Sequence, residues 1–162
     1  MRLKTKDVTI DGNRFRVGKL EVEYACWVLN LFMAKAAEKQ AARPAEPAVP
    51  EPPRQMTEAE AGDLVASFWT MIGTDLPADM YRQIQLACLL GCSVYQGDAP
   101  QPLKMVSGAW TKFGEEIAEA PRTVNRLIIE SLKFNLAPFF LEDALNAPPQ
   151  TTAAGRPSIA SR

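Results

Sequence analysis

The chain has 162 residues, of which 47% are apolar and 23% charged, with a formal net charge of −1 at pH 7. This length predicts one domain with a real core, and the near-zero net charge provides no general attraction to nucleic acid or to an anionic membrane. The chain contains no histidine, so it lacks the commonest general base and the commonest metal ligand.

The first predicted element is a hairpin within residues 7–20. Asp11 and Gly12 supply the positive φ angles that a tight turn needs. A loop with an even number of residues places the apolar side chains of both strands on one face, whereas a three-residue loop would separate them. These side chains are Val8, Ile10, Phe15 and Val17. Because an isolated hairpin is marginally stable, we expect this face to lie on the helix that follows.

That helix is predicted from about Leu20 to about Lys39. Acidic residues at its start and lysines near its end complement the helix dipole. Residues 24–33 are apolar nearly all round the helix. Such a helix is either wrapped by its own domain or covered by a partner, and the sequence leaves both possibilities open.

Proline then dominates the composition of residues 41–55, which predicts an extended, semi-rigid spacer. Residues 146–162 are rich in Pro, Thr, Ala and Ser and are expected to be a disordered tail. The predicted organisation is a single domain over residues 1–145, interrupted by the spacer at 41–55.

Two helices are predicted after the spacer. Residues 57–60 fit a capping box, and apolar residues at helical spacing continue to Gly73. The next helix is expected to begin at about Pro77, a favourable first-turn residue, and to end at Gly97.

A second short hairpin is a candidate around Ser107 and Gly108. The last helix begins near residues 121–123, and Pro138 is expected to break it, with a short turn over residues 139–145. Its predicted buried side chains are Val124, Leu127, Ile128, Leu132 and Leu136. The predicted fold class is therefore mainly α: a small helical domain with an N-terminal β-hairpin and a candidate second hairpin before the last helix.

The sequence offers no chemistry typical of an enzyme. Cys26, Cys88 and Cys92 are interpreted as small buried apolar residues, and two cysteines four residues apart are not a zinc site without further ligands. No nucleophile has a base to activate it, and no phosphate-binding loop occurs. We predict a protein that is not an enzyme, with no catalytic residues, no cofactor and no metal.

No secretion signal is visible, and the densest apolar stretch, residues 24–37, is shorter than the ~20 residues of a membrane span. We therefore expect a soluble, cytosolic protein with no membrane partner. A small nucleic-acid-binding adaptor remains an alternative because the N-terminal hairpin segment is basic, with Arg2, Lys4, Lys6, Arg14, Arg16 and Lys19. Alternating basic residues on a hairpin are more typical of a solvated face, so no nucleic-acid partner is expected.

The remaining signal is a surplus of large apolar side chains. They fill the core, or some of them form an adhesive surface for another chain. The residues assigned to partner binding on this hypothesis are Trp27, Leu31, Phe32, Phe139 and Phe140.

The order of these motifs resembles the tail assembly chaperones of long-tailed bacteriophages. The resemblance rests on the hairpin over residues 10–20 and on the ending that runs from Leu127-Ile128-Ile129-Glu130 to Phe139-Phe140. Pro77 and Trp110 also resemble that family. The resemblance covers residues 7–39 and 57–140.

The resemblance implies a non-enzymatic protein that binds the tape measure protein in the host cytoplasm, keeps it soluble and helps recruit tail tube subunits. It also implies absence from the mature virion and a longer form made by ribosomal frameshifting. The surplus of apolar side chains leaves self-association as a further option. A structural tail component retained in the virion is the alternative within phage assembly.

Overall fold

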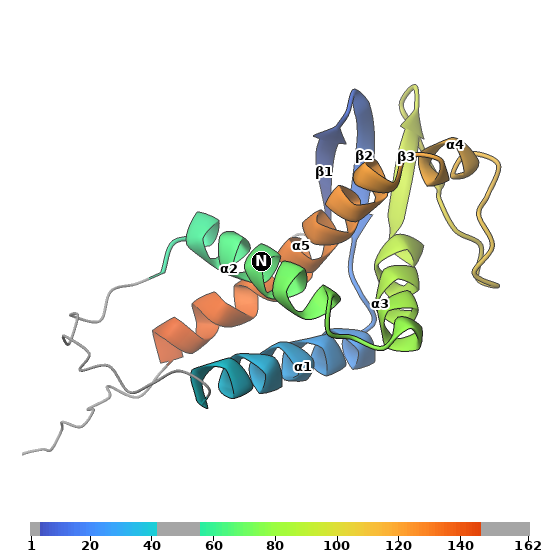
Figure 1. The fold of residues 1–162 in the computed structure, drawn as a ribbon. Helices are drawn as coiled ribbons and strands as arrows, with labels where there is room; N and C mark the ends of the chain where they lie inside the picture. The colour runs from blue at the N-terminus through green and yellow to red at the C-terminus, as the bar shows by residue number, and fades with distance from the viewer. Residues whose placement is uncertain (1–3, 42–55, 147–162) are drawn as a thin grey trace, which may run out of the picture.

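The computed structural model describes residues 4–41 and 56–146, so the predicted spacer and tail lie almost entirely outside the described residues. Four strands and five helices are described (Figure 1). Their order is β1 Thr5–Ile10, β2 Asn13–Gly18, α1 Val22–Ala41, α2 Glu58–Gly73, α3 Ala78–Leu90, β3 Cys92–Gln96, β4 Ala99–Pro102, α4 Glu115–Ala118 and α5 Pro121–Asn146.

The predicted N-terminal hairpin is confirmed. β1 and β2 pair antiparallel around a two-residue loop, in which Asp11 has φ 49° and Gly12 has φ 83°. Val8 lies opposite Phe15 in this register. The even loop therefore places the apolar side chains of both strands on one face, where Ile10, Phe15 and Val17 are buried.

The predicted third helix is wrong beyond Gly91. Helix α3 ends at Leu90, and the next residues form β3, which pairs with β2 through Phe15 and Val94. Gly91 approaches the end of β2 so closely that its carbonyl accepts the Gly18 N–H at 2.8 Å. A Cβ at Gly18 would lie 2.8 Å from that carbonyl oxygen, so only glycine fits there. Strand pairing with a distant segment overrides the local helical pattern.

The second hairpin also lies elsewhere than predicted. β3 and β4 pair around a turn at Gly97 (φ 63°) and Asp98. The segment around Ser107 and Gly108 forms only an isolated bridge between Lys104 and Trp110. The four strands form one antiparallel sheet in the order β1-β2-β3-β4, so the fold is an α+β mixture and the mainly α prediction is wrong.

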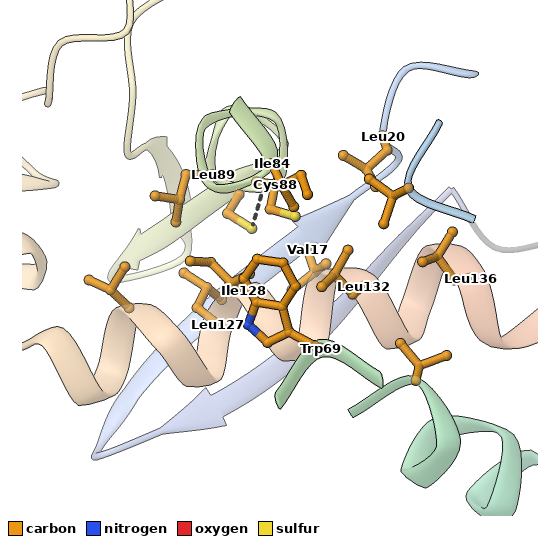
Figure 2. Packing of buried hydrophobic residues seen from close by; sticks show 14 of the residues in the cluster. Val17, Leu20, Trp69, Ile84, Cys88, Leu89, Leu127, Ile128, Leu132 and Leu136 are labelled. Carbon is orange, nitrogen blue, oxygen red and sulfur yellow. Dashed lines mark hydrogen bonds between the residues drawn. The ribbon is translucent and has the colours of Figure 1, made fainter. Parts of the chain in front are cut away.

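Helix α5 is the centre of the core. It packs against β1 and β2 of the sheet and against α2, α3 and α1. The hairpin therefore lies on α5, and the expectation that it lies on the helix that follows it is wrong. Figure 2 shows the buried side chains of α5 facing Val17 from β2, Trp69 from α2, and Ile84 and Cys88 from α3. The α5 side chains with no exposed surface are Leu127, Ile128, Leu132 and Leu136, all of which the sequence predicted.

Pro138 does not break α5, which continues to Asn146. Proline has no N–H, so the regular helical hydrogen bond to the Phe134 carbonyl cannot form. The residues around the proline are nevertheless packed, because Ala137 is buried and Phe140 contacts Phe68 of α2. Tertiary packing therefore continues the helix past a residue that would end an isolated one.

Candidate functional site

Helix α1 is covered by the rest of the domain along one side only. Ala25, Val28 and Phe32 are buried, and their three- and four-residue spacing places them on one side of the helix. On the adjacent side, about 90° around the helix, Val22 has an exposed fraction of 76% and Met33 one of 50%. Helix α1, whose residues 24–33 are apolar nearly all round, is therefore covered along one side and left open beside it (Figure 1).

We define the α1 face as Val22, Cys26, Leu29 and Met33. Leu29 is partly buried, and the other three side chains are exposed. The four positions follow one another at spacings of four, three and four residues, which is the alternation of a coiled-coil seam. None of them is charged. An exposed seam of this kind suits a second helix.

The sequence hypothesis named a different set of partner-contacting residues: Trp27, Leu31, Phe32, Phe139 and Phe140. Phe32 is fully buried. The other four are partly buried and pack against the core. Trp27 lies beside the exposed Tyr24, with ring centroids 6.4 Å apart in an edge-on arrangement. Phe32 is therefore part of the core, while the other four side chains each keep some exposed surface.

Phe32 and Phe140 both belong to a row of aromatic rings that are centred on Phe68. The ring of Phe68 on α2 lies 5.6 Å from that of Phe32 on α1 and 6.0 Å from that of Phe140 on α5. Aromatic pairs at this distance add to the stability that burial alone provides. Phe32 and Phe140 thus hold three helices together, and part of the apolar surplus is internal packing.

The sequence reasoning missed Val22, Cys26 and Met33 as exposed positions. Their coiled-coil spacing was available in the sequence, but the apolar residues between them conceal it. Reading such a pattern requires knowing which side of the helix is buried, and that depends on where α2, α3 and α5 lie.

The cysteines differ in environment. Cys88 and Cys92 are buried, and the Cys92 thiol donates a hydrogen bond to the Cys88 carbonyl at 3.2 Å. Burial raises the pKa of Cys88 to about 12 and also raises the pKa of Cys92. Cys26 is exposed, so the prediction that all three cysteines are buried is wrong at that position.

Over residues 4–41 and 56–146, no three His, Cys, Asp or Glu side chains lie close enough together to hold a metal ion. Within the same residues, no helix has both the length and the apolar character required to cross a membrane.

A second open surface is a groove of about 730 Å³ between α2, α5 and the start of the chain. We call it the α2–α5 groove. Its lining residues are Lys6, Lys19, Glu58, Ala59, Gly62, Asp63, Lys133, Phe134, Ala137, Pro138 and Leu141. Its floor is apolar, and charged side chains surround the floor.

The basic residues of the hairpin are engaged within the sheet. Arg14 donates to an Asp7 carboxylate oxygen at 2.8 Å, and its guanidinium lies 4.1 Å from the centroid of the Tyr95 ring. Arg16 lies 5.3 Å from the same ring. The Tyr95 hydroxyl donates to Asp7 at 3.0 Å. The hydrogen bond from Arg14 is the main cause that lowers the pKa of Asp7. This aromatic ring is therefore covered by arginine rather than open for base stacking.

Comparisons with protein-family models, with curated proteins and with solved structures give no match to this chain.

Proposed function

We propose that this chain is a non-enzymatic tail assembly chaperone of a long-tailed bacteriophage, which binds the tape measure protein in the host cytoplasm and keeps it soluble. The observation that carries the proposal is the uncovered α1 face: an uncharged apolar seam that lies beside the buried side of its helix. The family named in the proposal comes from the order of the sequence motifs, which resembles that of the tail assembly chaperones.

The α1 face suits the proposed client. A tape measure protein is a long, aggregation-prone chain, so its chaperone has to cover apolar segments repeatedly rather than bind one site tightly. A seam at coiled-coil spacing pairs with a helix by side-chain interdigitation and requires no titratable group. Each copy contributes four side-chain contacts. Many copies bound along one client raise the overall affinity through multivalency.

The recruitment of tail tube subunits is a second part of the proposal. We assign it to a longer form of the chain made by frameshifting, and we place neither form in the mature virion. Self-association through the same apolar seam is compatible with this role, because many copies are required along one client.

Co-expression with the tape measure protein encoded nearby tests the proposal. We expect the client to move into the soluble fraction and to co-purify with this chain. A client that stays insoluble and unbound would contradict the proposal. Mass spectrometry of purified virions separates the chaperone from a structural tail component, because only the structural component remains in the particle.

A further inference from the structure

The α2–α5 groove has the construction of a helix-binding site. Ala59 and Gly62 lie on one side of α2, while Phe134, Ala137 and Leu141 repeat at three- and four-residue spacing along α5. Two helical walls with an apolar floor between them accommodate a third helix, which packs at 8–10 Å from its neighbours.

The α2 side of the groove is lined in part by two small residues. Ala59 has only a methyl group and Gly62 has none, and a Cβ added at Gly62 would lie 3.0 Å from the Lys133 Cε. Gly62 is itself buried, with the Lys133 stem lying against it. Small side chains at such positions allow close approach of a neighbouring helix.

Lysines outnumber acidic residues in the lining of the groove. Glu58 and Asp63 lie on α2, whereas the three lysines come from three other segments, and the Lys133 stem lies against α2 at Gly62. The three lysines are Lys6 on β1, Lys19 after β2 and Lys133 on α5.

One acidic side chain outside the lining holds two of these lysines in place. Glu130 lies 3.1 Å from Lys133 and 4.0 Å from Lys6. The Lys19 ammonium lies 4.5 Å from the centroid of the Phe134 ring, over the apolar floor. The three lysines together carry more positive charge than Glu130 neutralises, so this part of the groove is complementary to acidic groups on an occupant.

We propose that the α2–α5 groove binds an amphipathic helix of the client, with an apolar ridge on the groove floor and acidic residues along the edge that faces Lys6, Lys19 and Lys133. This inference rests on the proposed function, because it names the segment class within the same client. It adds a second contact, separate from the α1 face and with charge specificity that the α1 face lacks.

Site-specific photo-crosslinking in the co-expressed complex tests the proposal. A photoreactive benzoylphenylalanine is placed at Ala59, which is exposed and lines the groove, and in a control at Ser67, which is exposed on the same helix outside the groove. We expect Ala59 to crosslink to an amphipathic segment of the tape measure protein that carries Asp or Glu along one edge. We expect no such product from Ser67.

Charge reversal then tests the orientation of that segment. Lys6→Glu is expected to reduce crosslinking from position 59 by about two- to fivefold, the range for an exposed ion pair. Changing the mapped client acid to lysine should restore it. Leu141→Glu, which puts a charge on the groove lining, should reduce crosslinking of the same client segment from position 59, whereas Ser67→Glu should not.

Each contrary result has a distinct meaning. If the client co-purifies and Ala59 gives no client crosslink, the groove inference is overturned and the proposed function stands. Crosslinks from Ala59 to a second copy, or to residues 42–55 or 147–162 of the same chain, also overturn it. If the client does not co-purify at all, the proposed function itself fails.

Discussion

The Asn135 side chain ties the end of the sheet to the start of α1. Its amide oxygen accepts the backbone N–H of Leu20 at 2.9 Å, and its amide nitrogen donates to the Gly18 carbonyl at 3.1 Å and to the Ser131 carbonyl at 2.9 Å. Asn135 is buried, so these bonds form away from water. One polar side chain on α5 therefore fixes the direction in which α1 leaves β2, and with it the orientation of the α1 face.

We predict that Asn135→Ala lowers the free energy of unfolding by ~1–3 kcal/mol, because it leaves buried backbone groups without their partners. Urea denaturation followed by circular dichroism measures this loss. Asn30→Ala is the matched control, since Asn30 is exposed and its replacement should change stability by less than about 0.5 kcal/mol. If the two substitutions lower the free energy of unfolding equally, the Asn135 hydrogen bonds do not stabilise the fold.

Phe32 and Met33 provide a second matched pair, adjacent in sequence and opposite in environment. Phe32→Ala should cost ~3–5 kcal/mol because it leaves a cavity among three helices. Met33→Ala removes an exposed side chain and should cost less than about 0.5 kcal/mol. Denaturant unfolding of both variants checks the assignment. A destabilised Met33→Ala protein would place Met33 in the core and remove it from the α1 face.

The cysteines predict a simple labelling pattern. At pH 8 the native chain should react rapidly with maleimide at Cys26 alone, because burial raises the pKa of Cys88 to about 12 and blocks access to both other thiols. Denatured protein should react at all three cysteines. Mass spectrometry counts the labels, and Cys26→Ser should leave the native chain unlabelled. Rapid labelling of more than one native cysteine contradicts this packing.

The Asp7 cluster predicts a pH dependence. The pKa of Asp7 is lowered from its usual 3.8, first by the hydrogen bond from Arg14. A lowered native pKa means that the stabilisation by Asp7 is fully present above pH 3.8 and is lost as the pH falls through the native pKa. We therefore expect the wild-type chain to be more stable than Asp7→Asn at pH 7 and the two to converge as the pH falls below the native pKa of Asp7. A difference that stays constant throughout an acid titration would show that ionisation of Asp7 is not responsible.

The sequence predicted the features that depend on local chemistry. The Asp11-Gly12 turn dictates its own geometry, and the capping box at Thr57 and Glu60 is present with both of its hydrogen bonds. The buried stripe of α5 follows from helical periodicity. These features require no knowledge of distant parts of the chain.

The features that depend on distant partners were not predictable in this way. β3 is a strand because Val94 pairs with Phe15, 79 residues earlier, and α5 continues through Pro138 because α2 packs beside it. The α1 face illustrates the same limit. Its residues look like core residues in the sequence, and only the positions of the other helices show that Val22 and Met33 are uncovered.

The most direct test of the central claim is co-expression of the tape measure protein with the Val22→Glu/Met33→Glu variant. Thr70→Glu, on the exposed side of α2, is the control, and thermal unfolding establishes that both variants fold. If the α1 face binds the client, the double variant should leave the client insoluble while the control and the wild-type chain keep it in solution. A folded double variant that solubilises and co-purifies with the client as well as the wild-type chain does would contradict the account.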